Sequence, residues 1–176
     1  MDQAALSAPV SANRTNVILS AIGANNAADD QTQFVSFAIG THQYGVDIMA
    51  VREIKGGTDI THLPKQPDYV RGVLDLRGII VPIVDLRCRF GQGLTETTPL
   101  HIVIIVQIDG RQVGLIGDRV LDIVTVEANQ IQQVPDTGAR GEASFLAGIV
   151  THDDVMIALI DLPNLLAAPV DLGAAA

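Results

Sequence analysis

The fold is decided by a stretch that occurs twice, GVLDLRGIIVPIVDL at Gly72–Leu86 and GIVTHDDVMIALIDL at Gly148–Leu162. The two copies align without a gap, from a shared glycine to a shared Asp-Leu pair. Internal repeats decide the architecture, and a solenoid needs at least three of them. Two copies therefore predict two similar small units that pack side by side.

Each copy is typical of a β-hairpin followed by a short helix. In the first copy the turn contains Arg77-Gly78, where glycine can adopt a positive φ. In the second copy His152-Asp153-Asp154 occupies the turn. Pro82 has no N–H group to donate, so we expect it at a sheet edge or a bulge. Asp85 and Asp161 are suited to cap the helices that follow.

Three further strands are predicted before each copy, so that each unit has five. Asp109-Gly110 between two apolar runs is a strong hairpin signal. The fold class is therefore all-β, with two tandem five-stranded β-barrels, because closure hides the strand edges. The predicted units are approximately 33–90 and 100–166, tandem or intertwined, within a domain at 33–168. The upstream strands are Gln33–Ile39, Tyr44–Met49 and Val51–Ile54 in the first unit, and His101–Ile108, Val113–Ile116 and Val120–Val126 in the second.

Composition excludes several classes of partner. Eleven basic and twenty acidic residues give a net charge of −9, which disfavours nucleic acid. The single cysteine, Cys88, cannot form an internal disulfide, so a reducing compartment is the default. No apolar run approaches the roughly 18 residues that span a bilayer, so direct membrane insertion is not expected. Residues 1–32 and 169–176 are interpreted as flexible tails.

The sequence offers no catalytic constellation. His42, His62, His101 and His152 do not have the spacing of metal ligands. Arg87 and Arg89 flank Cys88 and could lower its pKa, but no partner base can be named for a nucleophile. The phosphate-binding and nucleophile-elbow motifs are absent. We therefore expect no enzymatic activity, no cofactor and no metal.

Polar residues on the predicted strands leave two interpretations open. Glu53 interrupts an apolar strand, and Arg71 and Arg77 bracket the first repeated hairpin. They are either ordinary solvated charges, or part of a docking surface where arginine meets a partner carboxylate. A duplicated β scaffold without catalytic residues favours a protein–protein adaptor. The alternative is a small-molecule-binding β-barrel sensor, which would need a pocket with convergent polar groups.

Three stretches resemble the CheW family of chemotaxis coupling proteins. They are YVRGVLDLRGIIVPIVDLRCRFG at Tyr69–Gly91, FVSFAIGTHQYGVDIMAVREI at Phe34–Ile54 and DGRQVGLIGDRVLDIV at Asp109–Val124. The resemblance implies two SH3-like five-stranded barrels and no catalytic activity. It also implies a cytoplasmic adaptor that is recruited to receptor arrays at the inner face of the membrane.

The resemblance further implies partners and binding residues. The partners would be the regulatory domain of a CheA-type histidine kinase and the cytoplasmic tip of methyl-accepting chemoreceptors. Val51 and Glu53 match positions associated with partner binding, and Ile123 matches an apolar position near the receptor groove. Gly72, Arg77 and Gly78 match the family's glycine-and-arginine hairpin, where binding and structural support are not separated. The family usually has asparagine where this chain has Asp75.

Overall fold

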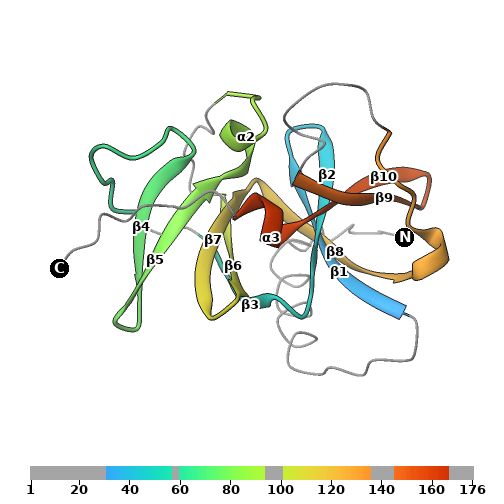
Figure 1. Ribbon diagram of the computed structural model, residues 1–176, viewed down its shortest axis with the longest axis horizontal. Coiled ribbons are helices and arrows are strands. Elements are labelled where there is room, and N and C mark those ends of the chain that lie inside the picture. The colour runs from blue at the N-terminus through green and yellow to red at the C-terminus, as the bar shows by residue number, and fades with distance from the viewer. Residues whose placement is uncertain (1–30, 57–59, 94–100, 136–144, 167–176) are drawn as a thin grey trace, which may run out of the picture.

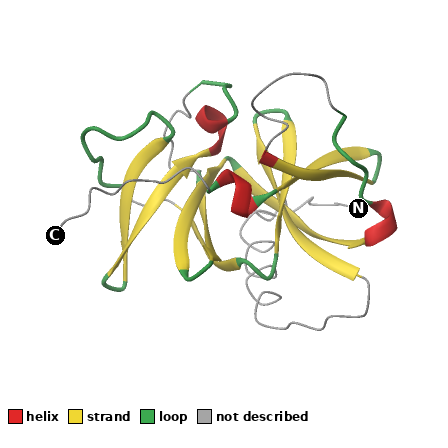
Figure 2. Ribbon diagram, in the orientation of Figure 1, coloured by secondary structure: helices red, strands yellow, loops and turns green. Residues whose placement is uncertain are grey.

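The computed structural model describes residues 31–56, 60–93, 101–135 and 145–166, which form ten strands in two five-stranded sheets. Figures 1 and 2 show the two sheets side by side, with short helices near their junction. The predicted all-β class is confirmed. The predicted tails lie outside the described residues, except that Gln31 and Thr32 already belong to the first strand.

The sheets have the strand orders β8-β1-β2-β10-β9, which we call sheet A, and β3-β6-β7-β5-β4, which we call sheet B. Sheet A consists of β1 (Gln31–Ile39), β2 (His42–Asp47), β8 (Arg119–Glu127), β9 (Leu146–His152) and β10 (Val155–Ile160). Sheet B consists of β3 (Val51–Gly56), β4 (Val70–Leu76), β5 (Ile79–Asp85), β6 (Ile102–Ile108) and β7 (Arg111–Gly117). The short helices are α2 (Leu86–Arg89), η1 (Ala128–Gln130) and α3 (Leu162–Leu165).

The two predicted units exchange their first hairpins. In the repeat, β1–β5 of the first unit correspond in order to β6–β10 of the second. When these counterparts are matched, both sheets have the same strand order. However, sheet B is the continuous segment 51–117, whereas sheet A combines 31–47 with 119–160. The units are therefore intertwined rather than tandem, and the ranges 33–90 and 100–166 do not correspond to the sheets.

A one-residue connection explains one of the two crossings between the sheets. Asp118 is the single residue between β7 and β8, whereas hairpin loops usually need at least two. Strand β8 therefore cannot fold back on β7 and passes into the other sheet. Ile48–Ala50 make the corresponding crossing between β2 and β3. Each crossing forms a backbone hydrogen bond with an exchanged hairpin. The Asp118 N–H donates to the Ala38 carbonyl of β1, and the Gln107 N–H of β6 donates to the Ala50 carbonyl.

The Asp118 carboxylate holds the crossing between β7 and β8 in place. It accepts a hydrogen bond from the Gly40 N–H at 2.7 Å and one from Arg87 Nη2 at 3.1 Å. His101 Nε2 lies 3.5 Å from its other oxygen. Gly40 belongs to the β1–β2 turn of sheet A, whereas Arg87 and His101 adjoin sheet B. Asp118 therefore joins the two sheets through a partly buried, charged hydrogen-bond network.

We expect Asp118→Ala to lower the free energy of unfolding by about 2 kcal/mol, because hydrogen bonds to charged groups are each worth about 1.5–3 kcal/mol. For a chain of this size the melting midpoint should fall by roughly 4–8 °C in calorimetry. Asp109→Asn, in an exposed turn where asparagine is equally suited, is the matched control. An Asp118→Ala melt equal to that of the control would show that the network does not stabilise the crossing.

The hydrophobic core has three parts. A central cluster between the sheets includes Phe37 and Tyr44 from sheet A and Ile104 and Leu115 from sheet B. Smaller clusters lie within each sheet, around Ile83 in sheet B and Leu159 in sheet A. Burial of Val, Ile and Leu at these places supplies most of the driving force for folding. The central cluster fixes how the two sheets lie against each other.

An arginine is sandwiched between two repeat-related aromatic rings. Arg89 Cζ lies 4.3 Å from the centroid of the Tyr69 ring and 4.5 Å from that of the Phe145 ring. These two aromatics precede β4 and β9 at equivalent positions of the repeat. Phe90 stacks on Tyr44 at 5.0 Å between centroids. Cation–π and aromatic contacts thus link the end of α2 to both sheets.

The repeated glycine and aspartate have local structural roles. Gly72 adopts a φ of 143°, and a Cβ there would overlap the backbone carbonyl of Thr61. At Gly148 an added Cβ would contact the Ile131 side chain and the Gln132 backbone. The neighbouring residues form isolated bridges, Thr61 with Val73 and Gln132 with Ile149. The segment at Thr61 therefore approaches the first repeated hairpin closely at Gly72, and the segment at Gln132 approaches the second at Gly148. The predicted caps are confirmed, because Asp85 accepts from Cys88 N–H and Asp161 from Asn164 N–H.

Candidate protein-binding surface

Two of the predicted binding residues contact each other at the β4–β5 turn. Arg77 Nη2 lies 3.1 Å from Glu53 Oε2, and Lys55 Nζ lies 3.6 Å from Glu53 Oε1. The Arg77 side chain is 76% exposed, and its backbone φ of 53° is unusual for a residue other than glycine. The sequence therefore places a solvent-exposed ion pair between the hairpin and β3.

The backbone of the turn explains why Gly78 follows Arg77. Gly78 has a φ of 85°, so both central residues have positive φ, as a type I′ turn requires. The Gly78 N–H donates to Asp75 Oδ1 at 2.8 Å. Asp75 thus supplies the side-chain acceptor that asparagine could also supply. From this turn the Arg77 side chain reaches Glu53 of β3.

Three of the predicted residues, Val51, Gly72 and Ile123, do not lie beside this ion pair on the surface. Val51 is buried in the central cluster, opposite Val106 of β6. Gly72 lies against the Thr61 backbone. Ile123 is half-buried in β8, opposite Val35, and therefore belongs to sheet A, whereas Glu53 belongs to sheet B. A role for these residues in binding stays a prediction.

Exposed apolar side chains, which the sequence reasoning did not single out, lie at both repeated hairpins. Ile79 and Ile80 are 53% and 55% exposed, and their repeat counterparts Val155 and Met156 are 39% and 63% exposed. Their exposure follows from the parallel pairing. Strand β7 pairs with β5 only over Ile83–Asp85, and β2 pairs with β10 only over Ile157–Leu159. Each hairpin extends beyond its sheet, and Pro82 occupies the resulting local edge.

The two hairpin ends differ in charge: the β9–β10 turn carries two exposed aspartates, whereas Arg77 at the β4–β5 turn is paired with Glu53 and lies close to Asp75. We define the β4–β5 end as Arg77, Ile79 and Ile80, and the β9–β10 end as Asp153, Asp154, Val155 and Met156. Figure 1 shows the first end at the left of the molecule and the second at the right. Asp153 and Asp154 have φ values of 50° and 61°, and both residues are exposed.

Reactive chemistry is not evident among the described residues. No group of three or more His, Cys, Asp and Glu side chains in that part of the chain could hold a metal ion. Burial raises the pKa of the Cys88 thiol, and the nearby carboxylates of Asp85 and Asp68 raise it further, whereas Arg71 lowers it. The suggestion that neighbouring arginines activate Cys88 is therefore wrong. No helix in the described ranges has the length and apolar character needed to cross a membrane.

The fold and the two hairpin ends define a class, the two-sheet β scaffold with exposed apolar side chains at opposite ends. Comparison with known proteins gives the family. The model of the CheW-like domain matches residues 33–170. The chain therefore belongs to the CheW family.

Individual relatives agree over most of the chain. A chemotaxis protein CheW from Rhizobium meliloti is 42% identical over 132 residues, which is 75% of this chain and 85% of the relative. A chemotaxis protein CheW from Klebsiella aerogenes is 35% identical over 136 residues, or 77% and 82% of the two chains. The crystal structure of the scaffolding protein TtCheW from Thermoanaerobacter tengcongensis matches with a TM-score of 0.70 and 33% identity, covering 78% of this chain and 89% of that one.

Proposed function

We propose that this chain is a non-catalytic chemotaxis adaptor that couples methyl-accepting chemoreceptors to a CheA-type histidine kinase. The adaptor would act in the cytoplasm, recruited to receptor arrays at the inner face of the membrane. Membership of the CheW family supports this role. The observation that carries the proposal is the pair of hairpin ends on one scaffold, each with exposed apolar side chains and with different charged residues.

The chemistry of these ends suits protein partners. Large apolar side chains that lose contact with water on binding supply affinity, and charges at the rim select the orientation of the partner. Arg77 can meet a carboxylate with two parallel hydrogen bonds, whereas Asp153 and Asp154 favour a basic partner surface. One scaffold can thus hold two partners at once, because its two ends are separate and chemically distinct.

The proposal is tested by titrating the full chain with the regulatory domain of a CheA-type kinase and with the cytoplasmic fragment of a methyl-accepting receptor. Binding to both partners, together in one complex, is the expected result in calorimetry and in size-exclusion chromatography. If neither partner binds, the proposal is wrong. If only one binds, the chain is a binding module and not a coupling protein.

We expect Glu53→Lys to weaken partner binding by roughly tenfold while the melting midpoint changes little. The substitution places a third positive charge beside Arg77 and Lys55, but exposed ion pairs contribute only about 0–1 kcal/mol to folding. Asp68→Lys also replaces a carboxylate with an amine, at an exposed residue outside this ion pair, and serves as the control. A melting midpoint that falls in proportion to the affinity would show that Glu53 has a structural role instead.

A further inference from the structure

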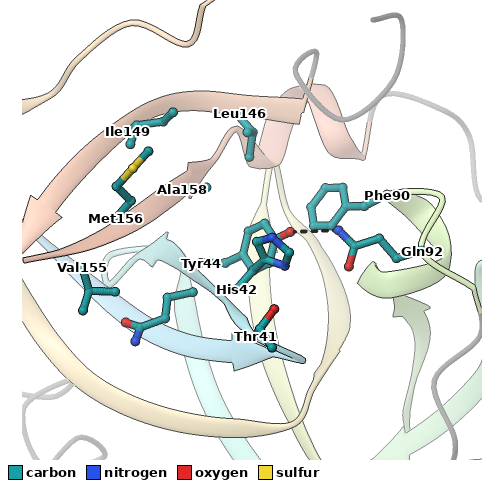
Figure 3. Close-up of a pocket in the computed structure, with 11 residues that line it drawn as sticks. Thr41, His42, Tyr44, Phe90, Gln92, Leu146, Ile149, Val155, Met156 and Ala158 are labelled. Carbon is teal, nitrogen blue, oxygen red and sulfur yellow. Dashed lines mark hydrogen bonds between the residues drawn. The ribbon is translucent and has the colours of Figure 1, made fainter.

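A pocket lies on sheet A and shares Val155 and Met156 with the β9–β10 end. It encloses about 460 Å³ between the start of β2, the residues after α2, and strands β9 and β10. Figure 3 shows its lining side chains, which come from the exchanged β1–β2 hairpin, from the residues after α2 and from β9 and β10. None of the six residues predicted from the sequence to bind partners lines it. The volume lies within the range of pockets that hold small organic molecules.

The lining has a polar side and an apolar side. Thr41, His42 and Gln43 lie near Tyr44, whose hydroxyl accepts a hydrogen bond from Gln92 Nε2 at 3.4 Å. In Figure 3 the Tyr44 hydroxyl and the Gln92 amide meet beside the Phe90 ring. The facing wall is apolar and consists of Leu146, Ile149, Val155, Met156 and Ala158. A ligand with an apolar body and one hydrogen-bonding head group complements both sides.

The lining also limits the charge of a ligand. It contains one imidazole, that of His42, but no carboxylate and no lysine or arginine. A charged ligand would therefore leave water for a mostly apolar wall, and such desolvation is costly. An uncharged head group, such as an amide or an alcohol, can instead exchange hydrogen bonds with the polar side at little cost.

The repeat shows that this pocket is not a general consequence of the fold. Leu146, Ile149 and Ala158 are half-buried in sheet A, whereas their counterparts Val70, Val73 and Pro82 in sheet B are buried. Alanine at position 158 in place of proline leaves room above β10. The two copies therefore diverge at this place, and only the second keeps these positions open to a cavity.

We propose that the pocket binds a small uncharged molecule that has an aliphatic or aromatic body and a single amide or hydroxyl head group. The apolar body would lie against Leu146, Ile149 and Ala158. The head group would lie toward the Tyr44 hydroxyl and the Gln92 amide. Val155 and Met156 belong both to the lining and to the β9–β10 end, so the bound molecule would lie beside that end. The proposal does not depend on the coupling function.

The test is an NMR titration of the full chain with hexanamide and 1-hexanol as probes, and with hexanoate and hexylamine as charged probes of the same length. We expect saturable shifts confined to backbone amides around the pocket. The neutral probes should bind roughly tenfold more tightly than either charged probe. If shifts are absent up to the solubility of the probes, or spread over the surface, the proposal is wrong. Equal binding of hexanoate would also overturn it.

Two variants make the location of binding testable. Ala158→Leu fills the pocket and should weaken hexanamide binding about fivefold or more, whereas Ala128→Leu, the same change on exposed η1, should not. Tyr44→Phe keeps the ring and removes the hydroxyl, so it provides a second variant should Ala158→Leu destabilise the fold. It should weaken binding of hexanamide and 1-hexanol alike. Unchanged affinity in a folded Ala158→Leu or Tyr44→Phe protein would contradict the assignment.

Discussion

Gly72→Ala is expected to lower the free energy of unfolding by about 3 kcal/mol and the melting midpoint by roughly 6–12 °C. The added Cβ would overlap the Thr61 carbonyl oxygen, which belongs to backbone and cannot rotate away. The φ of 143° is also a conformation that essentially only glycine adopts. Differential scanning calorimetry and urea unfolding both measure this change.

The second copy of the repeat provides the control. At Gly148 an added Cβ would meet Ile131 Cγ2 at 2.5 Å, and this methyl group can move. Gly148 does not have a positive φ. We therefore expect Gly148→Ala to cost only about 1 kcal/mol. Equal losses in the two variants would show that the Thr61 backbone can shift, and that Gly72 is not fixed by close approach.

The second large effect is expected at the hairpin ends. Ile80→Asp and Met156→Asp should each weaken binding of at least one partner by tenfold or more, because burying such a side chain contributes about 1.5–3 kcal/mol. Both side chains are already more than half exposed, so the melting midpoints should stay close to that of the unaltered protein. Titrations with the kinase regulatory domain and with the receptor fragment measure the loss.

Specificity is tested by comparing the two ends and a neutral site. Thr125→Asp places the same charge on exposed β8 and should leave both affinities unchanged. If the ends serve different contacts, Ile80→Asp and Met156→Asp will differ in which contact they weaken. If neither variant weakens any contact, the hairpin ends are not docking surfaces, and the apolar side chains there have no role in coupling.

The strands and helix caps could be predicted because they are local properties of the sequence. The mostly apolar run Phe34–Ile39 predicts β1, Asp109-Gly110 predicts the β6–β7 turn, and Asp85 and Asp161 are recognisable caps. The exchange of hairpins could not be predicted from these patterns, since β1–β2 and β6–β7 fit equally well beside either set of partners. Only the one-residue connection at Asp118 indicates that the chain continues into the other sheet.

The binding surface was predictable only in part. The Glu53–Arg77 contact joins residues 24 positions apart, and the sequence identified each residue separately. Ile80 and Met156 were hidden within apolar runs that look like buried strands. Their exposure depends on how far β7 and β2 extend along β5 and β10, and sequence periodicity does not encode the length of a parallel pairing.

The exchanged hairpins have a consequence for how this architecture could arise. A chain cut between β5 and β6 would give two fragments, each with the hairpin of one sheet and three strands of the other. Neither fragment holds a complete sheet, so the two would have to fold around each other. The protein thus has the organisation of a domain-swapped dimer of half-length chains fused into one polypeptide. Fusion removes the requirement for symmetry, and it allows the two ends to acquire different charged and apolar residues.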